Sequence, residues 1–332
     1  NIIASEGLGL DVVSGGELYS ALKSDINPSF IYFHGNNKSF NELELAIKNN
    51  VTLVLDNFQE LENIINVVKE TNLNGKIMIR LKPEIEAHTH EYIKTGQIDS
   101  KFGVEKESVH ALISKIVDHS KLEFLGIHSH IGSQIFESKP YYELVDVMTD
   151  HLKNIKDICG VDVQQLNLGG GIGISYTEED APLDVSIFMK TLITLLAEAC
   201  TKKGLSYPKL LFEPGRSIIG TAGITLYTIG TIKEIPDIRT YLFIDGGMAD
   251  NPRPIMYKSE YTFDIFTENK EQSIYSIAGK FCESGDILAK DVTLPNAKVG
   301  DVLVVFGTGA YNYVMASNYN RACKPAMISV SN

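Results

Sequence analysis

Three short segments carry groups that could bind an aromatic molecule bearing negative charge. They are residues 128–133 (HSHIGS), 169–173 (GGGIG) and 213–216 (EPGR). Each directly follows a short apolar run of the kind that forms a β-strand. Because the carboxyl ends of parallel strands meet at one edge of a sheet or barrel, an imidazole, a glycine-rich turn and a carboxylate are expected to meet there.

The three successive glycines at Gly169, Gly170 and Gly171 are the segment most suggestive of phosphate binding. Backbone amides without a side chain nearby can surround a phosphate group. A tight turn that needs positive φ angles would also use glycine. Three glycines in a row are more than a turn requires, so the pattern favours phosphate. Their spacing is not that of a dinucleotide-binding loop.

Glu213 and the two histidines offer groups for an aromatic ring. A carboxylate beside a pyridine nitrogen keeps that nitrogen protonated, which suits pyridoxal phosphate. A local ion pair with Arg216, worth little at a surface, is the alternative role for Glu213, and the motif alone leaves both open. We expect only one of His128 and His130 to point into the site, and His130 is the better candidate.

The order of apolar runs and amphipathic stretches predicts a barrel domain followed by a β domain. In residues 1–220, seven strand candidates alternate with helical patterns, as in a (β/α)₈ TIM-like barrel whose first strand lies upstream of Asn1. An open sheet of seven strands is the alternative. Residues 221–332 contain strands joined by short loops, which predicts an antiparallel β domain that completes the active site. The seven barrel strands are expected at residues 10–14, 30–34, 52–56, 76–82, 124–130, 165–168 and 209–212.

Loops of the predicted β domain carry further reactive side chains. Cys282 beside Glu283 could donate a proton, or it could be a buried cysteine in an ordinary polar turn. Arg253 could bind a carboxylate, and Tyr311 places a phenol beside a glycine turn.

Composition excludes several classes of partner. The 332 residues carry a net charge of −12 with scattered basic side chains, so nucleic acid and anionic membranes are not expected partners. No apolar run reaches the length of a membrane span. The four cysteines form no CxxC pair, which argues against a metal site or disulfide framework and favours a cytoplasmic location.

Taken together, these motifs resemble the fold-type III pyridoxal-phosphate-dependent decarboxylases, and among them the diaminopimelate decarboxylases. The resemblance extends over essentially the whole chain. It rests on residues 11–17, 33–36, 99–103, 128–133, 169–173, 213–216, 282–286, 309–311 and 315–320.

The resemblance implies a role for each candidate residue. His130 would stack on the pyridoxal ring, and Glu213 would pair with the ring nitrogen. Cys282 would stand near the reacting carbon, arriving with Glu283 from the other subunit of a homodimer, where Lys101 and Asp286 would pair across the interface. The phosphate or its approach would be lined by Ser133, Gly169, Gly170, Gly171, Gly215 and Tyr311. The substrate would contact Arg216, Arg253, Tyr257, Tyr311 and Glu283.

The resemblance also implies the reaction, which is decarboxylation of meso-diaminopimelate to L-lysine and carbon dioxide, the last step of lysine biosynthesis. Alternatives are an ornithine- or arginine-type decarboxylase and a non-catalytic homologue. A racemase would need an arginine at the position of Glu213. The family's Schiff-base lysine precedes the segment of Asp11 by more than the ten residues present here, so we expect it upstream of Asn1. Lys82 matches no catalytic position of the family.

Overall fold

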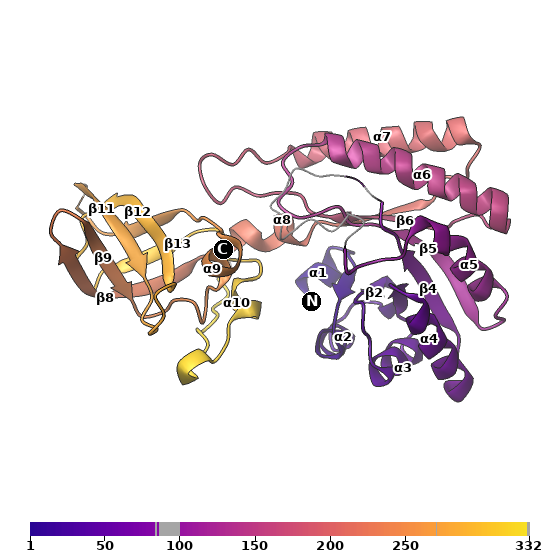
Figure 1. Ribbon diagram of the computed structural model, residues 1–332, viewed down its shortest axis with the longest axis horizontal. Helices are drawn as coiled ribbons and strands as arrows, with labels where there is room; N and C mark the ends of the chain where they lie inside the picture. Colours follow the sequence, from indigo (N-terminus) through magenta and orange to yellow (C-terminus); the bar gives the residue numbers. More distant parts are fainter. Residues whose placement is uncertain (84, 86–99, 270, 331–332) are drawn as a thin grey trace. The chain divides into compact units, whose positions relative to one another are not determined.

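The computed structural model describes residues 1–83, 85, 100–269 and 271–330. The chain forms two compact units (Figure 1). The first comprises Asn1–Gly171 and Leu183–Pro214, and the second Ile172–Pro182 and Gly215–Asn332. The main segment of the second unit therefore begins a few residues before the expected position 221. Asp99, the first residue of the motif at 99–103, lies outside the described residues.

The first unit is a nearly closed barrel of seven parallel strands, paired in the order in which they occur in the sequence. This confirms the predicted barrel class and the positions of all seven strands. The strands are β1 (Leu10–Val12), β2 (Ile31–Phe33), β3 (Thr52–Leu55), β4 (Gly75–Arg80), β5 (Leu122–His128), β6 (Gln165–Gly170) and β7 (Lys209–Glu213).

Helices follow the strands and present an apolar stripe to them. In α6, residues such as Tyr141, Leu144, Met148 and Leu152 recur at helical spacing and are buried, so one face of the helix packs inward. The helices of this unit are α1 (Ile2–Ser5), α2 (Gly15–Leu22), α3 (Phe40–Lys48), α4 (Phe58–Thr71), α5 (Lys106–Val117), α6 (Lys139–Cys159) and α7 (Val185–Lys203), with a 3₁₀ turn η1 (Pro28–Phe30) before β2.

Local signals in the sequence fix the ends of these helices. Ser39 begins α3 with a capping box, in which its hydroxyl accepts from the Glu42 amide while the Glu42 carboxylate accepts from the Ser39 amide. Gly160 and Gly204 end α6 and α7 with φ angles of 68° and 64°, a conformation that glycine adopts without steric cost. The strands are thereby held between helices of defined length, and their carboxyl ends share one rim.

Side chains inside the barrel link strands that are not neighbours in the sheet. The Tyr32 hydroxyl on β2 donates to the Gln165 side-chain oxygen on β6 at 3.0 Å. Val54 and Met78 are buried against Tyr32, and Leu211 of β7 packs on this cluster. The sheet is therefore curved strongly enough for its two halves to meet across the interior.

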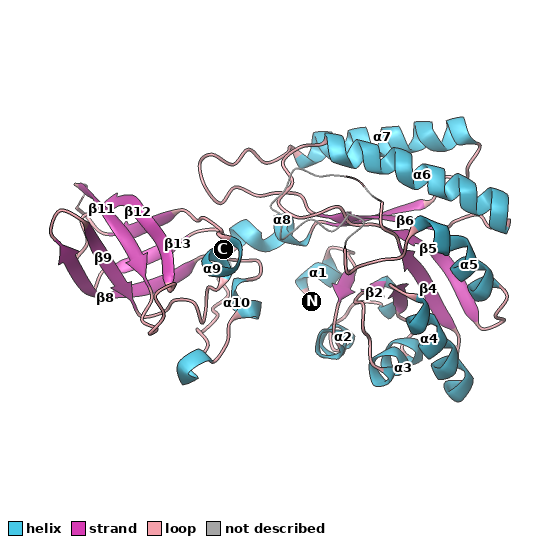
Figure 2. Cartoon of the chain, viewed as in Figure 1, coloured by secondary structure: helices cyan, strands magenta, loops and turns pink. Residues whose placement is uncertain are grey.

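The second unit is built on one six-stranded sheet in the order β10-β13-β8-β9-β11-β12 (Figure 2). The predicted antiparallel arrangement holds for every neighbouring pair except β9 and β11, which run parallel, so the sheet is mixed. Its strands are β8 (Thr225–Ile235), β9 (Arg239–Ile244), β10 (Phe263–Phe266), β11 (Gln272–Ala278), β12 (Ile287–Pro295) and β13 (Val302–Val305). The short helices are α8 (Gly215–Ile219), η3 (Gly220–Ala222), α9 (Arg253–Tyr257), α10 (Asn312–Met315) and η4 (Tyr319–Arg321).

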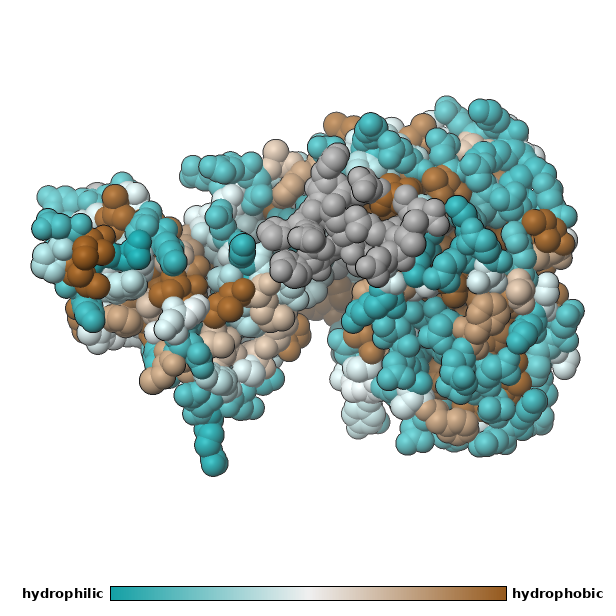
Figure 3. All heavy atoms as spheres, viewed as in Figure 1, coloured by the Kyte–Doolittle hydropathy of each residue, from teal (hydrophilic) through white to brown (hydrophobic). Residues whose placement is uncertain are grey.

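Alternating strand residues fill the core of the second unit. Ile229, Leu242, Ile277 and Leu303, each from a different strand, are fully buried in one cluster. The face of the molecule in Figure 3 is largely hydrophilic, with separate apolar patches. None of the described helices is both long and apolar enough to cross a bilayer.

Candidate active site

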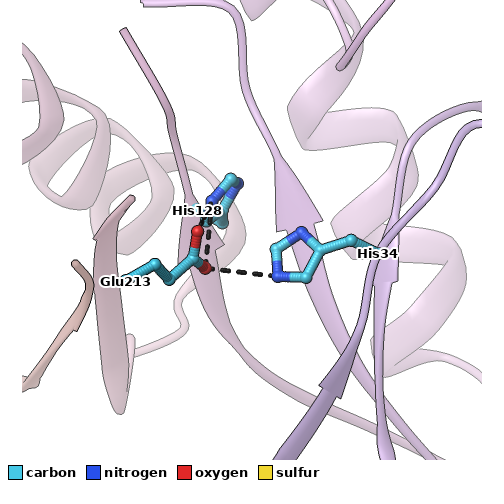
Figure 4. A group of neighbouring side chains, drawn as sticks. All are labelled: His34, His128 and Glu213. Carbon is cyan, nitrogen blue, oxygen red and sulfur yellow. Dashed lines mark hydrogen bonds and ion pairs between the residues drawn. The ribbon is translucent and has the colours of Figure 1, made fainter. Parts of the chain in front are cut away.

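A largely buried carboxylate, Glu213 at the carboxyl end of β7, is the centre of the candidate site, and its side chain is 16% exposed (Figure 4). Glu213 Oε1 accepts a hydrogen bond from Asn167 Nδ2 at 2.6 Å. His34 Nε2 lies 3.2 Å from the same oxygen, and His128 Nε2 lies 3.3 Å from the carboxylate. His34 follows β2, His128 ends β5 and Asn167 lies within β6, so the barrel topology itself brings these partners to Glu213.

The charge on Glu213 is balanced mainly by His34. Burial disfavours the His34 cation, but the Glu213 carboxylate and Asp11, whose Oδ1 is 3.6 Å away, outweigh it and raise the His34 pKa to about 9. Burial would likewise raise the pKa of Glu213, yet His128 and His34 hold that pKa well below its usual range. We attribute the effect on Glu213 to the His34 cation. Near neutral pH the cluster is thus an ion pair of Glu213 and His34.

The other two histidines of the site are neutral. Burial lowers the pKa of His128 to about 3 and that of His130 to about 4. His130 Nδ1 accepts a hydrogen bond from the Gly170 amide at 3.2 Å, so its proton resides on Nε2. Our expectation that only one of His128 and His130 points into the site is wrong: His128, the last residue of β5, contacts Glu213, and His130, just beyond the strand, contacts the Gly170 amide. His130 keeps its place in the site beside His128.

Close packing of the backbone requires glycine at positions 170 and 171, whether or not a ligand binds there. A Cβ on Gly170 would lie 1.8 Å from the Glu213 carbonyl oxygen, and one on Gly171 would lie 2.3 Å from the Gly132 carbonyl oxygen. The Gly169 amide donates to Asn167 Oδ1 and the Gly170 amide to His130. Two of the three amides expected to bind phosphate are therefore already occupied within the barrel.

The remaining phosphate candidates are spread over both units. Ser133 is half-buried in the segment between β5 and α6 of the barrel. Gly215 begins α8 of the second unit, and a Cβ there would meet no atom within 4 Å. Tyr311 precedes α10 with φ of 70°, a left-handed conformation that is costly for a residue other than glycine.

Two buried arginines of the second unit lie among tyrosine rings. Arg216 Nη1 donates to the Tyr176 hydroxyl at 2.5 Å, and its guanidinium carbon is 4.6 Å from the centre of the Tyr311 ring. Arg253 Nε donates to the Tyr261 hydroxyl at 2.8 Å, and its guanidinium also faces the Tyr257 ring at 5.4 Å.

Arg253 has neutral partners throughout its described surroundings. Its Nη2 donates to the Ser259 hydroxyl at 3.3 Å, and its side chain is largely removed from water. Among the ion pairs formed by the described residues, none involves Arg253. A buried cation held only by neutral groups is a suitable partner for a carboxylate.

The loop that carries Cys282 and Glu283 is exposed, and contacts with Tyr319 and Asp286 hold it in place. The Tyr319 hydroxyl donates to the Glu283 carboxylate, and the rings of Phe281 and Tyr319 are in contact. Asp286 is buried, and its oxygens accept from the Met248 amide at 2.7 Å and the Phe281 amide at 3.0 Å. Its carboxylate therefore anchors this loop within its own chain. The pairing of Lys101 with Asp286 across a subunit interface stays a prediction.

Sequence reasoning assigned no role to His34, Asp11, Arg80 or Asn167, although His34 and Asp11 lie in motifs that carry the family resemblance. Each lies in or directly after a barrel strand at the rim, a position that is itself a signal of function. Arg80 is buried enough that its pKa is lowered, although Asp56 and Glu213 oppose the shift. Lys82 pairs with Glu105 at 2.9 Å.

The His34 cation gives a testable pH dependence. Its folded-state pKa of about 9 exceeds the ordinary value of 6.5, so its stabilising contribution is complete below about pH 6.5 and is lost as the pH rises through about 9. We expect the difference in unfolding free energy between the wild type and His34→Gln to shrink over that interval in urea titrations. A constant difference across the interval would show that His34 is neutral in the folded protein.

Known proteins with the same pattern identify the family. The model of the pyridoxal-binding domain of pyridoxal-dependent decarboxylases matches residues 1–220. The chain is 48% identical to diaminopimelate decarboxylase of Synechocystis sp. over 99% of this chain and 72% of that protein, and 44% identical to the Bacillus subtilis enzyme over 98% and 76%. The crystal structure of M. jannaschii diaminopimelate decarboxylase in complex with L-lysine superposes with a TM-score of 0.89 at 35% identity, covering 96% of this chain and 73% of that one. The chain therefore belongs to the diaminopimelate decarboxylase family of pyridoxal-dependent decarboxylases.

Proposed function

We propose that this enzyme removes one carboxylate of meso-diaminopimelate as carbon dioxide, with pyridoxal phosphate as cofactor and L-lysine as product. The observation that carries the proposal is the Glu213 carboxylate at the rim of the barrel, which accepts a hydrogen bond from Asn167 and lies within 3.3 Å of His34 and His128. A fixed anion in this position is the partner that a protonated pyridine nitrogen requires.

The barrel residues fit pyridoxal phosphate chemically. Glu213 would hold the ring nitrogen protonated, and the neutral His130 imidazole would lie against the ring face. Gly171 has no Cβ and its amide is the one in the run that neither Asn167 nor His130 occupies, so we assign it to the phosphate, with Ser133. When bound, the cofactor withdraws electrons from the carbon that loses its carboxylate. The protein's task is to keep the Glu213 charge in place while this happens.

The second unit supplies groups for the substrate. Arg253 and Arg216 would bind the carboxylate at the end of the substrate that does not react, with Tyr257 and Tyr311 beside them. An ornithine-type decarboxylase acts on a substrate with an amine at that end, which an arginine would repel. The buried guanidinium of Arg253 therefore favours a substrate with two carboxylates.

Cys282 and Glu283 are proposed to act in the active site of a second copy of the chain. Both side chains are exposed on their own unit, as residues that contact a partner's site would be in the isolated chain. Cys282 would return a proton to the carbon left by carbon dioxide, and Glu283 would contact substrate. The active form would then be a homodimer. The cytoplasmic location suggested by the cysteines stays a prediction.

Substrate choice can be tested by measuring carbon dioxide release from meso-diaminopimelate, ornithine and lysine. We expect turnover of meso-diaminopimelate alone. Arg253→Lys should raise its KM by about tenfold or more, because a planar two-pronged donor to the carboxylate is lost. Arg239→Lys is the matched control, since Arg239 pairs with Asp291 on the surface of the same unit. Comparable turnover of ornithine would contradict the substrate assignment.

The shared site can be tested by mixing two inactive variants. Cys282→Ala and Glu213→Gln subunits should each be inactive alone. Random exchange into mixed dimers should restore about a quarter of wild-type activity, since one of the two sites in each mixed dimer is intact. No recovery, despite subunit exchange shown by native mass spectrometry, would place all of these residues in one chain's site.

A further inference from the structure

Asn167 is a buried polar side chain that joins two parts of the site. It lies on β6, two residues before Gly169, and 1% of its surface is exposed. Its Nδ2 donates to Glu213 Oε1 at 2.6 Å, and its Oδ1 accepts from the Gly169 amide at 2.9 Å. One side chain thus connects the central carboxylate to the start of the glycine run.

The backbone amide determines which way the Asn167 side chain faces. The Gly169 N–H can only donate, so it requires the oxygen of Asn167 and turns the NH₂ group toward Glu213. The reverse orientation would place an oxygen against a carboxylate and two donors against each other. Since an amide does not titrate, Asn167 offers a donor to Glu213 at every pH and favours its charged form.

The next amide of the run orients His130 in the same manner. The Gly170 N–H donates to Nδ1 and so leaves the proton of the neutral imidazole on Nε2. A Cβ on Gly169 would lie 2.6 Å from the Ser129 carbonyl oxygen and 2.7 Å from His130 Nδ1. Glycine is needed here because the backbone approaches the loop that carries His130. The first two amides of the run therefore act on protein side chains.

We propose that Asn167 is a positioning residue. The Gly169 amide fixes the orientation of its side chain, and the Asn167 NH₂ group then holds Glu213 in place for the pyridine nitrogen. The Gly169 and Gly170 amides orient Asn167 and His130, and the Gly171 amide is left for the phosphate. This inference rests on the proposed pyridoxal phosphate cofactor. It adds Asn167, a residue that would not contact the cofactor itself and would act on it through Glu213.

The test measures binding of a non-covalent probe to the cofactor-free enzyme by calorimetry. The probe is 4-deoxypyridoxine 5′-phosphate, which has the ring nitrogen and phosphate but no aldehyde to react with lysine. We expect Asn167→Ala to bind it about 10- to 100-fold more weakly than the wild type, because a hydrogen bond to a charged group is lost. Leu166→Ala is the control, since Leu166 is the fully buried neighbour on the same strand and successive strand residues face opposite sides. It should lower the unfolding midpoint while binding the probe within about twofold of wild type.

A second variant keeps the test decisive if Asn167→Ala does not fold. Asn167→Asp retains an oxygen for the Gly169 amide but places a second carboxyl group against Glu213. Two carboxylates this close share one proton, which replaces the missing donor at low pH and is lost as the pH rises. The ratio of wild-type to Asn167→Asp affinity should therefore increase between about pH 6 and about pH 9.

The outcomes separate this inference from the proposed cofactor. If the wild type does not bind the probe, the cofactor proposal fails, and this inference fails because it rests on that proposal. If the wild type binds and Asn167→Ala binds equally well, only the role of Asn167 is overturned. A pH-independent ratio for Asn167→Asp, or an equal loss of affinity in Leu166→Ala, would overturn it too, since a purely structural role would then account for the data.

Discussion

The rest of the site depends on keeping a carboxylate charged at a position that is largely removed from water. Removing Glu213 from water would ordinarily favour its neutral form, and a neutral acid could not hold a pyridine nitrogen protonated. The barrel counters this with donors from three other strands or the segments directly after them. His34 supplies a positive charge, Asn167 a donor that cannot titrate, and His128 a neutral imidazole. Each side chain is positioned by its own strand. These groups are therefore oriented when the protein folds, and little further free energy is needed to orient them when a ligand binds.

The same constraint gives the glycine run a second purpose. Its residues were expected to serve a phosphate, and the close approaches of Gly170 to Glu213 and of Gly171 to Gly132 show that packing alone would require glycine there. Packing and ligand binding are not competing explanations in this case. The lack of side chains lets β6 lie against its neighbours, and that proximity delivers its amides to Asn167 and His130.

Much of the fold could be predicted from the sequence because its signals are local. Alternation of apolar runs and amphipathic stretches located the seven barrel strands. Strand ends pointed to Glu213 and His130 for the same reason. The parallel pairing of β9 with β11 was not predicted. Short loops between β-rich segments suggest antiparallel hairpins, and no local sequence signal marks two strands that pair in parallel.

The missed site residues share a physical cause. Asn167 and His34 look ordinary in sequence, and their importance comes from strand register and from Glu213, which lies 46 residues from one along the chain. Likewise nothing in the sequence marks Asp286 as the acceptor of two backbone hydrogen bonds within its own chain. Residue type at a strand end predicts that a group is at the rim, but the protonation state of that group depends on contacts that only the folded barrel provides.

The ionisation of Glu213 is the central claim, and it can be measured directly. Carbon-13 NMR of the cofactor-free enzyme labelled at glutamate carboxyl carbons, with Glu213→Gln used to assign the resonance, would follow this one group. We predict a carboxylate chemical shift that does not change between about pH 5 and about pH 9, consistent with a pKa well below the usual range. A resonance that titrates within that interval, showing a protonated Glu213 near neutral pH, would contradict the account.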